Sequence, residues 1–133
     1  MERILWIMLL LLTIAALLPR EVKSDYIEPV VEVIEVPSSV KPQYVENYLL
    51  VYKAFKDTPV MIAIADAESD FNASAKNPHS SASGLFQIIK GTWKAYECVG
   101  DPFNPTDNIE CAKKIYEDSG TSPWNESKHV WGV

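Results

Sequence analysis

The 133-residue sequence has few basic residues and no cluster of them. It contains 12 Lys and Arg against 18 Asp and Glu, which gives a formal net charge of −6 at pH 7. Nucleic-acid-binding domains concentrate positive charge on one face, so we expect no nucleic-acid partner. An acidic chain also gains no long-range attraction to anionic polymers, so recognition of such a polymer would have to occur at short range in a groove.

Cysteine and histidine are equally scarce. His79 and His129 stand at no ligand-like spacing from the two cysteines, Cys98 and Cys111. We therefore expect no metal site and no cofactor. In an exported chain a Cys98–Cys111 disulfide is expected, and closing this loop would contribute about 3 kcal/mol in the chain-entropy model. Two free buried thiols are the alternative.

No uninterrupted apolar run reaches the roughly 20 residues of a membrane span. The longest run, from Ile4 to Leu18, has 15 residues and is broken only by Thr13, which is typical of the hydrophobic region of a secretory signal. We expect residues 1–24 to be a signal peptide cleaved after Ser24, with two alternatives: cleavage after Ala16, or retention as a membrane anchor through residues 4–18. Each alternative exports the rest of the chain, to the cell envelope, the periplasm or the extracellular space.

Removal of residues 1–24 takes away two of the 18 acidic and three of the 12 basic residues, so the net charge becomes −7. Residues 25–42 then hold three prolines and four acidic residues against one lysine. This composition predicts an extended linker, with an edge strand as the alternative. Residues 43–133 are expected to form the folded domain, as a monomer.

Helical spacing of apolar residues dominates this domain. Helices are expected over 45–57, from Pro59 to Glu68 with Thr58 as N-cap, over 92–97 and over 106–119, with a short helix or turn over 124–131. Residues 71–84 have loop composition, and Leu85–Ile89 is interpreted as a short strand or the end of a hairpin. The fold class is therefore α+β and predominantly helical.

Glu68 closes an almost wholly apolar helical segment that begins at Val60. Helical geometry places Ala65, Ile64 and Met61 beneath its side chain. A carboxyl over an apolar stripe is poorly solvated, so its pKa is expected to rise, and the negative end of the helix dipole acts in the same direction. A carboxylic acid that stays protonated near neutral pH is what general-acid cleavage of a glycosidic bond requires. A surface glutamate at a helix end is the alternative.

The residues that follow Glu68 form an ordered set of motifs. They read Glu68-Ser69-x-Phe71-Asn72, Ala75, Ser83-Gly84-Leu85-Phe86-Gln87-Ile88 and Thr92, then Asn104-Pro105, Asn108-Ile109, Ala112 and Tyr116. This series resembles the lytic transglycosylases and their goose-type lysozyme relatives over roughly residues 60–118. The resemblance implies a lysozyme-like fold with a small β-hairpin beside the catalytic helix, and glycan strands of peptidoglycan as the partner.

Two positions depart from the family pattern, since Ala73 and Lys90 stand where proline is usual. The family's later Ala-Tyr-Asn-x-Gly segment, whose tyrosine supports the catalytic glutamate, is also missing. Trp124, Tyr96 or Tyr116 is expected to occupy that space instead.

The motifs and the side-chain chemistry together predict Glu68 as the catalytic residue. Gly84 is expected to let the backbone approach a ligand, Ser83 to keep a groove wall shallow, and Gln87 to offer a donor and an acceptor to an N-acetyl group. Aromatic rings are candidates for stacking on sugars, although a core position is the alternative for each. Ser69 is expected either to orient Glu68 or to cap its helix. The predicted substrate-binding set is Ser69, Ser83, Gly84, Phe86, Gln87, Tyr96, Tyr116 and Trp124.

Residues 71–96 contain no Asp or Glu, and Asp66 and Asp70 project away from Glu68 on a helix. A hydrolysing glycosidase usually needs two carboxylates. Glu68 acting alone fits the lytic transglycosylase scheme that the resemblance implies, in which the MurNAc–GlcNAc linkage is cleaved without water and leaves a 1,6-anhydromuramoyl end. The alternatives are a hydrolytic lysozyme and a non-catalytic module that binds wall glycan or acts as an envelope scaffold.

Overall fold

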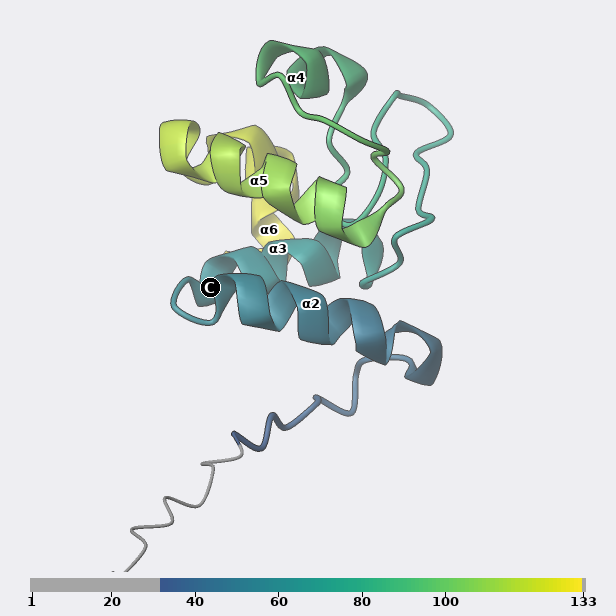
Figure 1. Cartoon of the computed structure of the whole chain (residues 1–133), viewed down its shortest axis with the longest axis vertical. Coiled ribbons are helices and arrows are strands. Elements are labelled where there is room, and N and C mark those ends of the chain that lie inside the picture. The colour runs from purple at the N-terminus through teal and green to yellow at the C-terminus, as the bar shows by residue number, and fades with distance from the viewer. Residues whose placement is uncertain (1–31, 133) are drawn as a thin grey trace, which may run out of the picture. The chain divides into compact units, whose positions relative to one another are not determined.

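The computed structural model describes residues 32–132, and the predictions made for residues 1–31 lie outside this range. Across the described range no helix is both long enough and apolar enough to span a bilayer. The compact unit begins at Ile34, and most of its secondary structure is helical (Figure 1). Its elements in chain order are η1 (Pro42–Tyr44), α2 (Val45–Phe55), α3 (Pro59–Ser69), α4 (Lys90–Ala95), α5 (Pro105–Ser119), η2 (Ser122–Ser127) and α6 (Lys128–Trp131).

The segment before η1 packs on the domain, so the compact unit begins earlier than the predicted Gln43. Val40 is buried, and Ile34 and Val36 pack against the core. The Tyr48 hydroxyl donates a hydrogen bond to the Glu35 carbonyl oxygen. The linker prediction rested on the prolines and acidic residues of this segment and gave no weight to its apolar residues.

Helix α3 lies at the centre of the domain. It begins at Pro59 directly after Thr58, as predicted, although the Thr58 side chain makes no capping hydrogen bond. Met61, Ile64 and Ala65 are completely buried, and α2, η2 and α6 all pack against this helix. The helix ends because Asp70 and Phe71 adopt positive φ angles of 55° and 58°, which reverse the chain direction. Glu68 therefore lies in the last turn.

The predicted β-hairpin is not confirmed. Among the described residues the β structure consists of isolated antiparallel bridges, Lys76–Ser83 and Ser83–Ile88. The chain between Ser83 and Ile88 turns into the core, where Leu85 and Phe86 are fully buried. Burial of a side chain as large as Phe86 stabilises the fold by about 1.5–3 kcal/mol. The apolar character of this segment thus reflects an inward turn.

Asn108 of α5 holds this turn in place. Its Oδ1 accepts a hydrogen bond from the Phe86 backbone N–H at 2.9 Å, and its Nδ2 donates to the Ser83 and Pro102 carbonyls at 3.2 and 2.8 Å. Gly84, with a φ of 78°, permits this approach, because a Cβ there would lie 2.1 Å from the Pro102 carbonyl oxygen. The small residue therefore serves internal packing, and its predicted approach to a ligand stays a prediction.

The Cys98–Cys111 disulfide is confirmed, with a Cα–Cα distance of 5.4 Å. It connects the segment after α4 to the middle of α5. Helix α4 begins at Lys90, two residues before the predicted start, whereas α5 begins at Pro105 where Asn104 caps it through the backbone N–H groups of Thr106 and Asp107.

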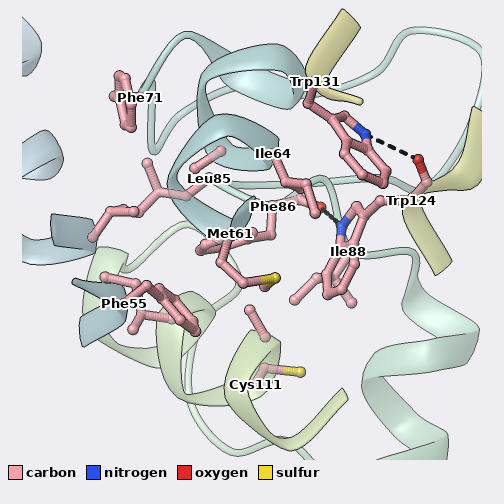
Figure 2. Close-up of a cluster of buried hydrophobic side chains, with 14 of the residues drawn as sticks. Phe55, Met61, Ile64, Phe71, Leu85, Phe86, Ile88, Cys111, Trp124 and Trp131 are labelled. Carbon is pink, nitrogen blue, oxygen red and sulfur yellow. Dashed lines mark hydrogen bonds between the residues drawn. The ribbon is translucent and has the colours of Figure 1, made fainter. Parts of the chain in front are cut away.

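Figure 2 shows the core that these elements enclose. Phe55 of α2 lies in edge contact with Phe86, and the Phe86 ring lies 6.0 Å from the Trp124 ring. The Trp124 indole N–H donates to the Phe86 carbonyl at 2.9 Å. Trp124 therefore joins η2 to the buried turn that contains Phe86.

Candidate active site

Glu68 is half-buried and lines a cavity of about 810 Å³. Its neighbours in the cavity come from three distant parts of the chain. Helix α3 contributes Ala67 and Glu68, and the loop after α3 contributes Asn77, His79 and Ser80. Opposite these are residues of η2 and α6, with Gln87, Ile88 and Thr92 also at the wall. The cavity has the size of a site for one or a few sugar rings.

Burial is the main cause of a raised pKa at Glu68, because a charged carboxylate loses hydration over the apolar α3 face. The negative charge of Glu126, which lines the same cavity, raises the pKa further. A hydrogen bond from Ser127 acts in the opposite direction. The net effect is a raised pKa of Glu68, which is the direction predicted from the apolar residues beneath its side chain.

Ser127, the last residue of η2, contacts Glu68 directly. Its Oγ lies 2.5 Å from Glu68 Oε1 and 3.0 Å from the Trp124 carbonyl oxygen. The Trp131 indole N–H donates to the same Oγ at 2.8 Å and also approaches the Trp124 carbonyl at 3.2 Å, a contact drawn in Figure 2. The carboxyl is thus held by a network that the C-terminal segment supplies.

The predicted role of Phe86 in sugar stacking was wrong, because its ring is fully buried and presents no face to a ligand. Trp124 is 5% exposed and lines the cavity. Most of its ring packs in the core, so it forms part of the floor of the site.

Gln87 lines the cavity, with a φ of 46°. Its Nε2 donates to the Ala75 and Gly84 carbonyls at 3.1 and 2.9 Å. This pair of acceptors also fixes which end of the amide is nitrogen. Both N–H bonds are therefore used internally, and the side chain offers a ligand its oxygen as an acceptor, where the sequence predicted a donor as well.

Ser69 and Ser83 have structural contacts. The Ser69 hydroxyl bonds to the carbonyl oxygens of Ala65 and Leu85, at 3.1 and 2.8 Å, so it joins the end of α3 to the buried turn and does not contact Glu68. The buried Ser83 hydroxyl donates to the Ser81 carbonyl. Ser83 lines a separate hollow of about 340 Å³ with Lys76, Lys90 and Trp93.

Neither tyrosine of the predicted set lines the cavity. The Tyr96 hydroxyl donates to the Asp118 carboxylate at 2.7 Å and lies 2.8 Å from the Ser119 hydroxyl, at the C-terminal end of α5. Tyr116 is half-buried against the core. Of the three residues expected beside Glu68, Trp124 lines its cavity, and the hydrogen bond to the carboxyl comes from Ser127.

Among the cavity residues absent from the predicted set are Ser127, Glu126, His79 and His129. They lie at least 11 positions from Glu68 in the sequence, and no motif connects them to it. Among residues 32–132, no group of three or more His, Cys, Asp or Glu side chains is arranged to hold a metal ion.

The fold and the site together define a small helical domain with one half-buried carboxyl at a sugar-sized cavity. A family model described as the transglycosylase SLT domain matches residues 52–127, more than half of the sequence. The chain therefore belongs to this family, which confirms the resemblance to lytic transglycosylases and agrees with the predominantly helical, lysozyme-like fold.

A curated relative is the probable transglycosylase SceD 2 of Staphylococcus saprophyticus subsp. saprophyticus. It is 36% identical over 67 residues, which cover 46% of this chain and 27% of the relative. This chain therefore matches only about a quarter of the relative's length. No solved structure matches this chain.

Proposed function

We propose that this domain is a peptidoglycan lytic transglycosylase in which Glu68 is the sole acid and base. The observation that carries the proposal is a half-buried carboxyl with a raised pKa at the wall of a cavity of about 810 Å³. Membership of the transglycosylase SLT domain family supports the same assignment, as does the name of the relative.

In the proposed reaction, protonated Glu68 donates its proton to the oxygen that links MurNAc to GlcNAc, and the bond from C1 to that oxygen breaks. The 2-acetamido oxygen of the substrate assists at C1. The Glu68 carboxylate then removes the proton of the 6-hydroxyl, whose oxygen forms the new bond to C1. The products are a 1,6-anhydromuramoyl end and a GlcNAc with a free 4-hydroxyl, and no water is consumed.

This function places the chain outside the cytoplasm, where its substrate lies, and makes glycan strands its partner. A signal peptide or a membrane anchor within residues 1–24 would provide the export route. The domain itself is proposed to act as a monomer, since Glu68, Gln87 and the opposite wall all come from one chain.

Replacement of Glu68 by Gln tests the assignment. We expect Glu68→Gln to lower release of soluble fragments from purified sacculi by at least about 100-fold, the scale of general acid–base catalysis, while the circular dichroism spectrum stays unchanged. The matched control is Glu117→Gln, since Glu117 is exposed on α5 and outside the cavity. Full activity in Glu68→Gln would reject Glu68 as the acid.

Hydrolysis is a second candidate because the tertiary structure brings another carboxylate to the cavity. Glu126 lines it together with Glu68, and a lysozyme-type hydrolase uses a second carboxylate as nucleophile or base. The absence of Asp and Glu from residues 71–96 therefore did not exclude a partner for Glu68.

Mass spectrometry of the released fragments distinguishes the two reactions. We expect ends that are one water lighter than ordinary reducing ends, and the same ends from Glu126→Gln, because the proposed reaction needs no second carboxylate. Ordinary reducing ends from the wild type, lost in Glu126→Gln, would assign hydrolysis with Glu126 as the second group. Binding of sacculi by the wild type with no soluble product would instead favour a non-catalytic module.

A further inference from the structure

The hydroxyl of Ser127 has three polar neighbours in fixed positions. One is a donor, the indole N–H of Trp131 at 2.8 Å, and two are acceptors, Oε1 of Glu68 at 2.5 Å and the Trp124 carbonyl at 3.0 Å. Both tryptophans are buried, Trp124 at 5% and Trp131 at 8% exposure. The indole rings therefore fix the point from which Ser127 approaches the carboxyl.

A count of hydrogens sets the direction of the bond. A hydroxyl has one proton and two lone pairs, and the Trp131 N–H occupies one lone pair. The proton goes to the nearer acceptor, Oε1, and the bond is strongest when the carboxyl is ionised, because bonds to a charged group are shorter and stronger than neutral ones. The Trp124 carbonyl still has the Trp131 N–H at 3.2 Å as a second donor.

The two carboxyl oxygens of Glu68 are thereby made unequal. Oε1 accepts from Ser127, while Oε2 has no hydrogen-bond partner among residues 32–132 and belongs to a side chain that lines the cavity. A proton on Glu68 is then favoured on Oε2, since Oε1 is already an acceptor.

We propose that Ser127 is the positioning residue of Glu68, which holds Oε1 and leaves Oε2 as the oxygen that gives up and takes back the proton. The inference rests on the proposed function of Glu68. The Ser127 hydroxyl can donate to Oε1 whether or not Oε2 carries a proton, so the same geometry serves the acid step and the base step. Ser127 itself touches no reacting atom.

The charges that face Glu68 determine how this role is measured. Glu126 of η2, His79 of the loop and His129 of α6 line the same cavity, whereas Asp66 lies exposed on α3 and Asp70 is the C-cap of that helix. Burial and the Glu126 charge raise the pKa of Glu68, whereas the Ser127 bond lowers it. Loss of Ser127 should therefore raise the pKa further and move the alkaline limb of the pH–rate profile to higher pH.

The test compares Ser127→Ala, Ser127→Thr and the matched control Ser122→Ala, an exposed serine of the same short helix. Turnover of soluble glycan strands gives kcat and KM, and carbon NMR gives the titration of the Glu68 carboxyl. We expect Ser127→Ala to lower kcat about 10- to 100-fold, the range for loss of a hydrogen bond to a charged group, with KM within about twofold. Its Glu68 titration should move to higher pH, while Ser127→Thr and Ser122→Ala stay close to the wild type.

Trp131→Phe supplies a second test that does not depend on folding of the alanine variant. It keeps an aromatic ring in the core and removes the N–H that holds Oγ, so a smaller change in the same direction is expected in both readouts.

An unchanged Glu68 titration in Ser127→Ala would overturn the proposal even if kcat fell, because a purely structural role lowers activity without changing that pKa. Wild-type kcat in Ser127→Ala would overturn it as well. Failure of the proposed function is distinguishable from these outcomes, since it appears as an active Glu68→Gln variant whatever the Ser127 titrations show.

Discussion

At the scale of the residue, the raised pKa of Glu68 results from what lies beneath and around its side chain. Ala65, Ile64 and Met61 were expected under the side chain from helical spacing, and all three are completely buried. The predicted direction of the pKa is confirmed, with burial as the largest cause. The opposing bond from Ser127 and the repulsion from Glu126 were not predicted, because both residues lie nearly 60 positions further along the chain.

The raised pKa of Glu68 also affects stability. In the unfolded chain its pKa returns to an ordinary value of about 4.3, so between that value and the higher folded value the folded state binds more protons. The free energy of unfolding must then fall as the pH rises through this window. Glu68→Gln removes the cost of ionising a half-buried carboxyl in the folded state. Its amide oxygen can still accept the hydrogen bond from Ser127.

We therefore expect Glu68→Gln to be more stable than the wild type near pH 7 and about equal to it near pH 4. Urea unfolding at several pH values measures the difference, with Glu117→Gln as control. A wild type that gains stability relative to Glu68→Gln as the pH rises would contradict the assigned direction of the pKa.

At the scale of the element, the site depends on segments that other elements hold in position. The turn from Gly84 to Gln87 was interpreted as a strand or hairpin end because it is apolar and follows a loop. Its Leu85 and Phe86 side chains instead fill the space between α2, α3 and α5 (Figure 2). Asn108 of α5 satisfies the backbone groups of this turn, a contact that local sequence patterns do not reveal.

The Cys98–Cys111 disulfide, which joins the segment after α4 to α5, gives a prediction at the scale of the element. Replacement of both cysteines, Cys98→Ser with Cys111→Ser, should lower the free energy of unfolding by about 3 kcal/mol, because the unfolded chain regains the entropy of an open loop. Neither cysteine lines the Glu68 cavity, so activity below the unfolding transition should stay close to the wild type.

Urea unfolding checks this value, and the wild type in a reducing buffer serves as the matched control. Equal stability of the oxidised wild type and the double variant would show that the bond does not stabilise the fold.

At the scale of the whole molecule, the cavity exists because the chain returns to α3 at its C-terminal end. Helix α3, the loop after it, η2 and α6 all contribute residues that line the cavity, and η2 and α6 pack against α3. The net charge of −6 gives no long-range attraction to an anionic polymer, so the proposed binding of wall glycan would depend on contacts inside this cavity.

The sequence by itself indicated the family, the helical fold class, Glu68 as the proposed catalytic residue and the direction of its pKa, because these depend on local spacing and on motifs that stay together along the chain. Only the tertiary structure decided which residues meet that glutamate. Ser127 and Glu126 line the cavity of Glu68 because η2 packs on α3, and Trp131 of α6 holds the Ser127 hydroxyl. Phe86 and Gly84 are buried in the core and do not line this cavity. Such contacts depend on how distant segments fit together in space, which spacing along one segment does not specify.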